Sequence, residues 1–165
     1  MAHCICMAQA HIKHKHCITI TNLIVHSDKT GFDKPFQFDI EYECLHDLPD
    51  DLEWRVIYCV GDESLDQELE MVLVGPVNTG HYRFWLQCNP PDVARIPVQH
   101  IVSKSVVLLT CSYHGKEMLR VGYFVNNMYE EDKLVRVVLA DKPRVTRFAF
   151  AYDELPAPAE ETETQ

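Results

Sequence analysis

Apolar and polar side chains alternate along several short segments of the chain. In residues 36–45, FQFDIEYECL, every second side chain from Phe36 to Cys44 is apolar, and the side chains between them are polar or acidic. A period of two is typical of a β-strand with one buried face. Similar strand-like segments are predicted at residues 17–25, 52–60, 72–77, 81–88, 103–113, 116–127, 134–140 and 144–152. Because no long amphipathic helix separates them, the pattern predicts an all-β antiparallel sandwich.

The predicted connections carry only short helical signals. Residues 61–71, GDESLDQELEM, favour an acidic helical turn, and residues 89–102, NPPDVARIPVQHIV, favour a proline-broken connection with one helical turn. Residues 128–133, MYEEDK, are expected to form an acidic link between two strands.

Three regions differ in composition. Residues 1–17 form an extension rich in His and Cys, residues 18–152 form one domain, and residues 153–165 form a tail rich in Pro and Glu. The extension and the tail lack the apolar side chains of a packed core, so we expect both to be disordered.

The segment at residues 103–113, SKSVVLLTCSY, is apolar on both faces. Because successive side chains of a strand point to opposite sides, Val106 and Leu108 share one face and Val107 lies on the other. One face serves the core, but the outer face of a sandwich strand is usually polar. The pattern leaves two alternatives for the second face: it is exposed for a partner, or a loop such as residues 89–102 covers it.

Charge and cysteine content narrow the class of protein. The chain has 165 residues, enough for one domain, with 15 Lys and Arg against 25 Asp and Glu and a net charge of -10. This balance argues against direct binding to nucleic acid or to an anionic membrane, and is compatible with a basic protein partner. Seven cysteines at irregular spacing, several of them within apolar segments, indicate reduced buried thiols in an intracellular protein.

The sequence carries no signature of catalysis or of a membrane protein. It lacks a glycine-rich phosphate loop and a nucleophile elbow, so we expect neither an enzyme nor a cofactor. No apolar run reaches the roughly 18–20 residues needed to span a membrane, and the N-terminus does not resemble a secretory signal.

The N-terminal His and Cys residues are candidate zinc or copper ligands, and they leave a metal-dependent protein as a third class of function. Cys4 and Cys6 are spaced too closely for a structural zinc pattern, so we expect no metal site there. Two acidic clusters also stand out, although most such clusters are solvated surface: Asp50, Asp51 and Glu53, and then Asp62, Glu63 and Asp66.

Four segments resemble the anti-silencing-function histone chaperone family. They are PFQFDIEYECLHDLPDDLEWRVIYCVG (35–61), VLVGPV (72–77), SVVLLTCSYHGKEMLRVGYFVNN (105–127) and PRVTRF (143–148). The resemblance extends from about Ile18 to Tyr152 and implies an elongated immunoglobulin-like antiparallel β-sandwich with short helices in its connections. It also implies a monomeric nuclear histone chaperone, with a cytoplasmic pool, and no enzymatic activity. Such a protein binds one dimer of core histones types three and four, blocks tetramer formation and passes histones to nucleosome assembly and disassembly factors.

The resemblance also implies three binding surfaces. A helix of histone type three is expected at Val106, Leu108, Arg120, Phe124, Asp66, Asp62 and Glu63. A segment of histone type four is expected to add as a strand along Pro143, Arg144, Val145, Thr146 and Arg147. Peptides from chromatin assembly factor and the HIRA-type complex are expected in an acidic groove formed by Asp50, Asp51, Leu52, Val72 and Val74.

Turn rules alone leave the neighbours of Val106 undecided. A two-residue turn at His114–Gly115 would place Val106 on the face of Val121, whereas a loop one residue longer would place it with Met118 and Arg120. The resemblance favours the second arrangement.

Two positions near this surface differ from the family pattern and support an alternative function. His100 stands where the family has a carboxylate, and Lys104 replaces a small apolar residue two positions before Val106. The link from Tyr129 to Asp141 is also shorter than in relatives. The alternative is therefore an interaction module of the same fold, with weakened histone binding, that retains peptide binding through the acidic groove.

Overall fold

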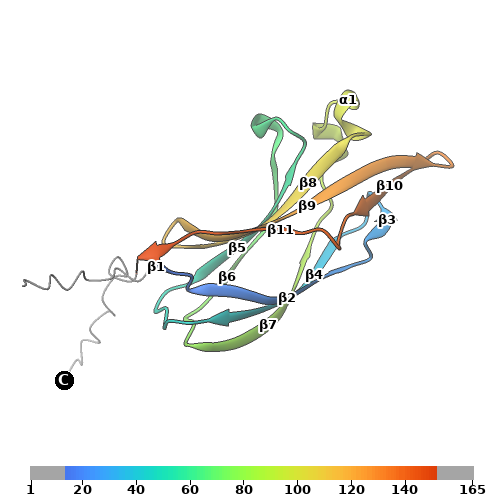
Figure 1. The fold of residues 1–165 in the computed structure, drawn as a ribbon. Coiled ribbons are helices and arrows are strands. Elements are labelled where there is room, and N and C mark those ends of the chain that lie inside the picture. The colour runs from blue at the N-terminus through green and yellow to red at the C-terminus, as the bar shows by residue number, and fades with distance from the viewer. Residues whose placement is uncertain (1–13, 152–165) are drawn as a thin grey trace, which may run out of the picture.

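The computed structural model describes residues 14–151, which form a seven-stranded and a three-stranded curled antiparallel sheet packed face to face, with a further two-stranded sheet near the ends of this range (Figure 1). The strands are β1 (His14–Lys15), β2 (Ile18–His26), β3 (Lys29–Gly31), β4 (Phe36–Cys44), β5 (Leu52–Cys59), β6 (Gln67–Val74), β7 (Gly80–Cys88), β8 (Lys104–Tyr113), β9 (Lys116–Glu130), β10 (Lys133–Val138), β11 (Arg144–Arg147) and β12 (Phe150–Ala151). The larger sheet has the order β3-β10-β9-β8-β5-β6, with β11 also paired to β9, and the smaller sheet has the order β2-β4-β7. The predicted immunoglobulin-like sandwich is confirmed.

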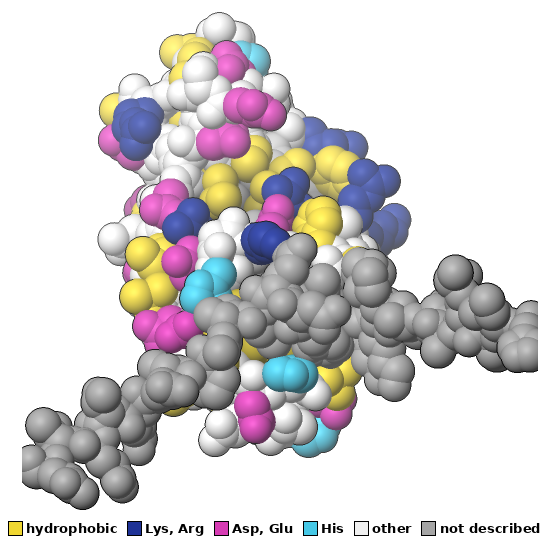
Figure 2. Space-filling view, turned by 90° about the vertical axis from the view of Figure 1, so that its left-hand side faces the viewer, with side chains coloured by type: hydrophobic (Ala, Val, Ile, Leu, Met, Phe, Trp, Pro, Cys, Tyr) yellow, Lys and Arg dark blue, Asp and Glu magenta, His cyan; other side chains and the backbone are white. Residues whose placement is uncertain are grey.

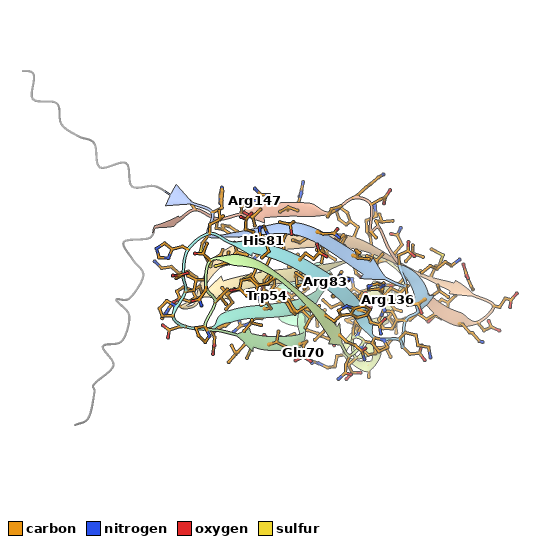
Figure 3. All side chains as sticks on the ribbon, turned by 90° about the horizontal axis from the view of Figure 1, so that it is seen from below. Trp54, Glu70, His81, Arg83, Arg136 and Arg147 are labelled. Atoms are coloured by element: carbon orange, nitrogen blue, oxygen red, sulfur yellow. The ribbon has the colours of Figure 1, made fainter. Side chains whose placement is uncertain are left out.

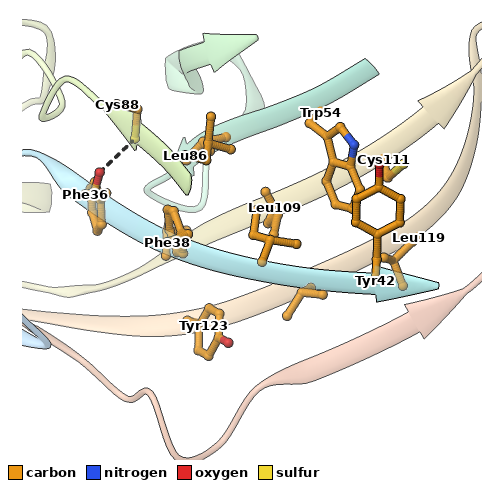
Figure 4. Packing of buried hydrophobic residues seen from close by; sticks show 14 of the residues in the cluster. Phe36, Phe38, Tyr42, Trp54, Leu86, Cys88, Leu109, Cys111, Leu119 and Tyr123 are labelled. Carbon is orange, nitrogen blue, oxygen red and sulfur yellow. Dashed lines mark hydrogen bonds between the residues drawn. The ribbon is translucent and has the colours of Figure 1, made fainter. Parts of the chain in front are cut away.

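The core lies between β4 of the small sheet and β5 and β8 of the large one (Figure 4). All five apolar side chains at alternate positions of β4 are buried, as the period of two predicts. The Tyr42 and Trp54 rings from the two sheets lie 5.2 Å apart, and Trp54 meets the edge of Phe84 at 5.3 Å. The aromatic residues therefore join the sheets.

The connections match the expectations from the sequence only in part. The acidic helical turn is present as the 3₁₀ helix η1 (Glu63–Leu65), and residues 89–102 contain η2 (Val93–Arg95) and α1 (Val98–Ile101). The predicted acidic link at residues 128–133 is wrong, because β9 continues to Glu130 and only two residues turn the chain into β10. Both turn residues, Glu131 and Asp132, have positive φ (49° and 64°), as a tight hairpin turn requires.

A buried arginine organises the loop before β4 (Figure 3). Arg136 of β10 is 1% exposed and donates hydrogen bonds to the carbonyl oxygens of Phe32 (3.2 Å), Lys34 (2.9 Å) and Pro35 (3.1 Å). Its guanidinium carbon lies 3.7 Å from the centroid of the Phe36 ring. Burial lowers the pKa of Arg136 to about 10. Because these carbonyls have a charged donor, the loop is held against the end of the sandwich.

Part of the predicted N-terminal extension belongs to the folded structure. His14–Lys15 pairs with Phe150–Ala151, and Cys17 is buried. Residues 1–13 and 152–165 lie outside the described part of the chain. The disorder expected for the rest of the extension and for the tail stays a prediction.

Candidate binding surfaces

The pairing of β8 with β9 decides which residues accompany Val106. Val106 pairs with Phe124, and Leu108 pairs with Gly122, so these four residues share the outer face of the large sheet. Val107, on the opposite face, is buried in the core. The second of the two arrangements considered from the sequence, in which Val106 shares its face with Arg120, is therefore the one present.

The turn itself has the short form. His114 and Gly115 both have positive φ (50° and 74°) and form a two-residue turn. The pairing then shifts between Cys111 and Ser112, and this bulge leaves Met118 as an extra residue. Met118 is buried, so the prediction that it shares the face of Val106 is wrong, although Arg120 does lie there.

The outer face holds a shallow apolar pocket of ≈ 390 Å³. Its lining consists of Val106, Leu108, Arg120, Gly122, Tyr123, Phe124, Arg144 and Thr146. The floor is open because residue 122 has no side chain: a Cβ there would lie 3.2 Å from Leu108 Cδ2. Phe124 stands at the margin with 45% of its surface exposed. None of residues 89–102, which lie within the described part of the chain, lines the pocket. The structure therefore does not have the alternative in which this loop covers the outer face of β8.

Basic side chains border this pocket. Arg120 forms two hydrogen bonds with Glu117, from Nε to Oε1 at 2.7 Å and from Nη2 to Oε2 at 2.9 Å, and the pair raises the pKa of Arg120. Arginine carries five N–H donors, so Arg120 keeps donors for a partner. Figure 2 shows hydrophobic side chains on one face of the molecule bordered by both basic and acidic ones.

The acidic turn lies next to the same pocket. Cys59, the last residue of β5, pairs with Val106 and so brings the chain from residue 60 onward to this position. Burial raises the pKa of Cys59 to about 12, and Asp66 contributes through its charge and a hydrogen bond. Asp62 Oδ1 accepts hydrogen bonds from Ser64 Oγ (2.7 Å) and N (3.0 Å), which lower the pKa of Asp62. The structure therefore places Glu63 and Asp66 near Cys59, the residue that pairs with Val106, with Asp62 in the same turn.

Both residues that depart from the family pattern lie near residues of this surface. His100, in α1, lies close enough to Asp62 to contribute to the lowering of its pKa, after the hydrogen bonds from Ser64. Lys104 Nζ lies 5.6 Å from the centroid of the Phe124 ring, a cation–π distance. The free protein thus has a lysine beside Phe124 and a histidine near Asp62.

An open strand edge borders the pocket on the other side. The residues of β11 pair with β9 from Arg144↔Gly122 to Arg147↔Leu119, and among residues 14–151 no other strand pairs with β11. All four β11 side chains are exposed, as is Pro143 before them. The predicted edge is therefore present, with one side free for a further strand.

The predicted acidic groove stays a prediction, and the structure gives the positions of its residues. Asp50 Oδ2 lies 2.8 Å from His114 Nε2, and Asp51 packs so closely on Gly75 that a Cβ there would lie 2.7 Å from Asp51 Cα. Leu52 is fully buried in the core, so its predicted place in the lining is wrong. The other two predicted lining residues, Val72 and Val74, are half-buried on β6, the last strand of the large sheet.

Leu73, which the sequence reasoning did not single out, is 56% exposed on the outer face of β6. Leu73 lies between Val72 and Val74, so the apolar pattern alone does not indicate which of these side chains faces solvent. Within residues 14–151, no group of three or more His, Cys, Asp or Glu side chains is placed to hold a metal ion. The candidate ligands before His14 lie outside the described residues. No helix of the described chain is long and apolar enough to cross a membrane.

Comparisons with known proteins agree on one family. A family model described as "ASF1 like histone chaperone" matches residues 15–153. The chain is 52% identical over 151 residues to "Probable histone chaperone ASF1A" of Arabidopsis thaliana, covering 82% of this chain and 76% of the relative. It is 44% identical to "Histone chaperone asf1" of Drosophila melanogaster (82% of this chain, 69% of the relative) and 42% identical to "Histone chaperone ASF1" of Saccharomyces cerevisiae (82% and 54%).

Proposed function

The chain belongs to the ASF1-like histone chaperone family, and from this we propose that it binds a single dimer of core histones types three and four. The juxtaposition of an apolar pocket, an acidic turn and an open strand edge on one face supports this proposal most strongly. A basic partner that offers one amphipathic helix and one extended segment would use all three features. Histone chaperones are not a class of enzymes, and the proposed mechanism is steric and electrostatic.

The pocket is the proposed site of the histone type three helix. Val106, Leu108 and Phe124 would receive its apolar face, and each buried side chain would contribute about 1.5–3 kcal/mol. Asp62, Glu63 and Asp66 would meet basic side chains of the histone and set its orientation. Arg120 would donate to a carboxylate or a carbonyl at the end of that helix.

The free edge of β11 is the proposed site of the histone type four segment. Strand addition would satisfy main-chain groups from Arg144 to Arg147 and would extend the large sheet beyond β11. With the helix and the strand both engaged, the histone surface that joins two dimers into a tetramer would be covered. Occlusion of this surface would keep the histones dimeric.

The acidic groove is proposed to bind short basic peptides from chromatin assembly factor and from the HIRA-type complex. Asp50 and Asp51 would attract the basic residues, and Val72 and Val74 would receive an apolar side chain. Because this groove and the pocket involve different residues, a histone dimer and an assembly factor could bind at once. The proposed place of action is the nucleus, with a cytoplasmic pool.

Calorimetric titration of the full chain with the purified histone dimer tests the central proposal. We expect saturable one-to-one binding at moderate salt, and size-exclusion chromatography should then give a complex with one copy of each histone. Absence of binding by a protein that unfolds cooperatively would reject it.

The alternative function, a peptide-binding module with weakened histone affinity, is favoured by the positions of His100 and Lys104. The double variant His100→Asp with Lys104→Val discriminates between the two functions. If the module is correct, only the variant binds histones while both proteins bind the assembly-factor peptide. If the chaperone is correct, both proteins bind histones.

A further inference from the structure

We propose that Cys17 and Cys44 form a two-thiol site that hydrogen peroxide converts into an intramolecular disulfide. This pair plays no part in the pocket, in the β11 edge or in the acidic groove. The sequence indicated only buried, reduced thiols, and the geometry of these two distinguishes them from the other described cysteines.

The backbone holds the two residues next to each other. Ile18, directly after Cys17, pairs with Cys44, and the amide of Leu45, directly after Cys44, donates to the carbonyl oxygen of Cys17 at 2.9 Å. These two contacts hold the backbone of Cys17 against the backbone of Cys44 and Leu45.

The two sulfur atoms point toward the same place. Cys44 Sγ lies 3.0 Å and Cys17 Sγ lies 3.8 Å from the carbonyl oxygen of His46. The two thiols are also near enough to each other to shift each other's pKa. Little movement is therefore needed to bring the sulfurs to bonding distance.

Electrostatics support Cys44 as the thiol that reacts first. The hydrogen bond from Cys17 lowers the pKa of Cys44 to about 7, whereas burial raises the pKa of Cys59 and of Cys88 to about 12. Burial also raises the pKa of Cys111 well above its ordinary value. The thiolate is the nucleophile in such reactions, so Cys44 is the described cysteine with the largest reactive fraction at neutral pH.

Both sulfurs are buried in the closed fold, with Cys17 at 1% and Cys44 at 0% exposure, so reaction requires a local opening. The position of Cys17 makes such an opening small. Cys17 precedes the first residue of β2, which is an edge strand of the small sheet, and His16 before it is exposed. Ends of edge strands open at far lower free energy than the core.

The chemistry balances with peroxide as the oxidant. The Cys44 thiolate attacks one peroxide oxygen, the O–O bond breaks, and a sulfenic acid forms as hydroxide leaves and takes up a proton. The Cys17 sulfur then attacks the Cys44 sulfur, its proton goes to the departing oxygen, and water leaves. The two sulfurs give up two electrons, and one peroxide becomes two waters.

The product would tie the start of β2 to the end of β4. It would close a loop through residues 17–44 and constrain the unfolded chain, so the oxidised domain should unfold at a higher temperature than the reduced one. The tie would also fasten the chain next to β1, where the N-terminal segment joins the domain.

Peptide mapping of the full chain tests the proposal. The protein is treated with hydrogen peroxide, alkylated after denaturation, and digested with trypsin without reduction. We expect residues 16–29 linked to residues 30–55, a mass lower by two hydrogen atoms, and a fall in free thiols from 7 to 5 per chain. Seven alkylated thiols, or Cys44 linked to Cys111 or to an N-terminal cysteine, would overturn the proposal.

Two variants give the matched comparison. Cys17→Ser should abolish the linked peptide and the oxidation-dependent rise in melting temperature, whereas Cys59→Ser should keep both. A Cys17→Ser protein that still shows the oxidation-dependent rise would count against the pair. Because Cys17 lies at a strand end, this variant is expected to fold, and cooperative unfolding under reducing conditions verifies that it does.

Discussion

Replacement of Val106 by arginine separates binding from folding at the proposed histone pocket. Val106 lies on the outer face of β8, where it lines the pocket with Leu108 and Phe124. Val107, its neighbour, faces the core. Val106→Arg should therefore remove histone binding from a protein that remains folded.

The expected magnitude follows from burial and charge. Loss of a buried valine removes about 1.5–3 kcal/mol of binding free energy, which weakens the affinity about tenfold to a hundredfold. The new guanidinium must also lose water beside Arg120 and Arg144, which border the same pocket, and this adds a penalty. We expect a total loss of at least about a hundredfold. The free energy of unfolding should change by less than about 1 kcal/mol, because the long side chain can extend into solvent.

The assay combines calorimetric titration against the histone dimer with chemical unfolding of each protein. The matched control is Val107→Ala, which opens a cavity in the core. It should lower the free energy of unfolding by about 2 kcal/mol and leave histone affinity nearly unchanged. Unchanged histone affinity of Val106→Arg would refute the pocket as the helix site. Loss of its cooperative unfolding would refute the outward orientation.

Three further substitutions test other parts of the structure. Gly122→Ala should weaken histone binding about tenfold, measured by calorimetry, because a Cβ would fill the pocket floor, while stability changes little. Arg136→Met should lower the free energy of unfolding in urea by at least about 3 kcal/mol, because the carbonyls of the loop before Phe36 lose their donor. Arg83 lowers the pKa of Asp39 in the folded state, so the ionised carboxylate stabilises the fold above the ordinary aspartate pKa. Asp39→Asn should therefore be less stable than the parent at pH 7, and urea titrations should find the difference shrinking below about pH 4.

The alternation of side chains was enough to predict the core strands. In β4 all five alternate apolar residues are buried, and Asp39 is the buried exception, paired with Arg83. The turn at residues 131 and 132 was missed because no glycine or asparagine marks it. Its left-handed backbone is held by the long β9–β10 pairing rather than by local preference.

The candidate site depended on features that no local pattern carries. The bulge that leaves Met118 unpaired shifts by one residue the part of β9 that pairs with Val106, and nothing in the sequence around Cys111 marks it. From the sequence, Arg136 is a polar residue in a strand and would be expected at the surface. In the structure it is buried and donates hydrogen bonds to loop carbonyls. The Cys17–Cys44 pair likewise arises only when two distant strands meet. These contacts join residues far apart in the sequence, and the hydrophobic periodicity of a single sequence does not predict them.

Magnitudes also bear on the choice between a working chaperone and a module that has lost histone binding. The contact of Lys104 with Phe124 is an exposed cation–π pair, worth about 0.5–1 kcal/mol, and a partner would need to displace it. A charge at the rim such as His100 near Asp62 alters binding by about 1 kcal/mol at most. Together these costs remain below the gain from burying two apolar side chains, each about 1.5–3 kcal/mol. The two departures should therefore weaken histone binding and leave it measurable, so the unmodified chain should bind histones before His100 or Lys104 is changed.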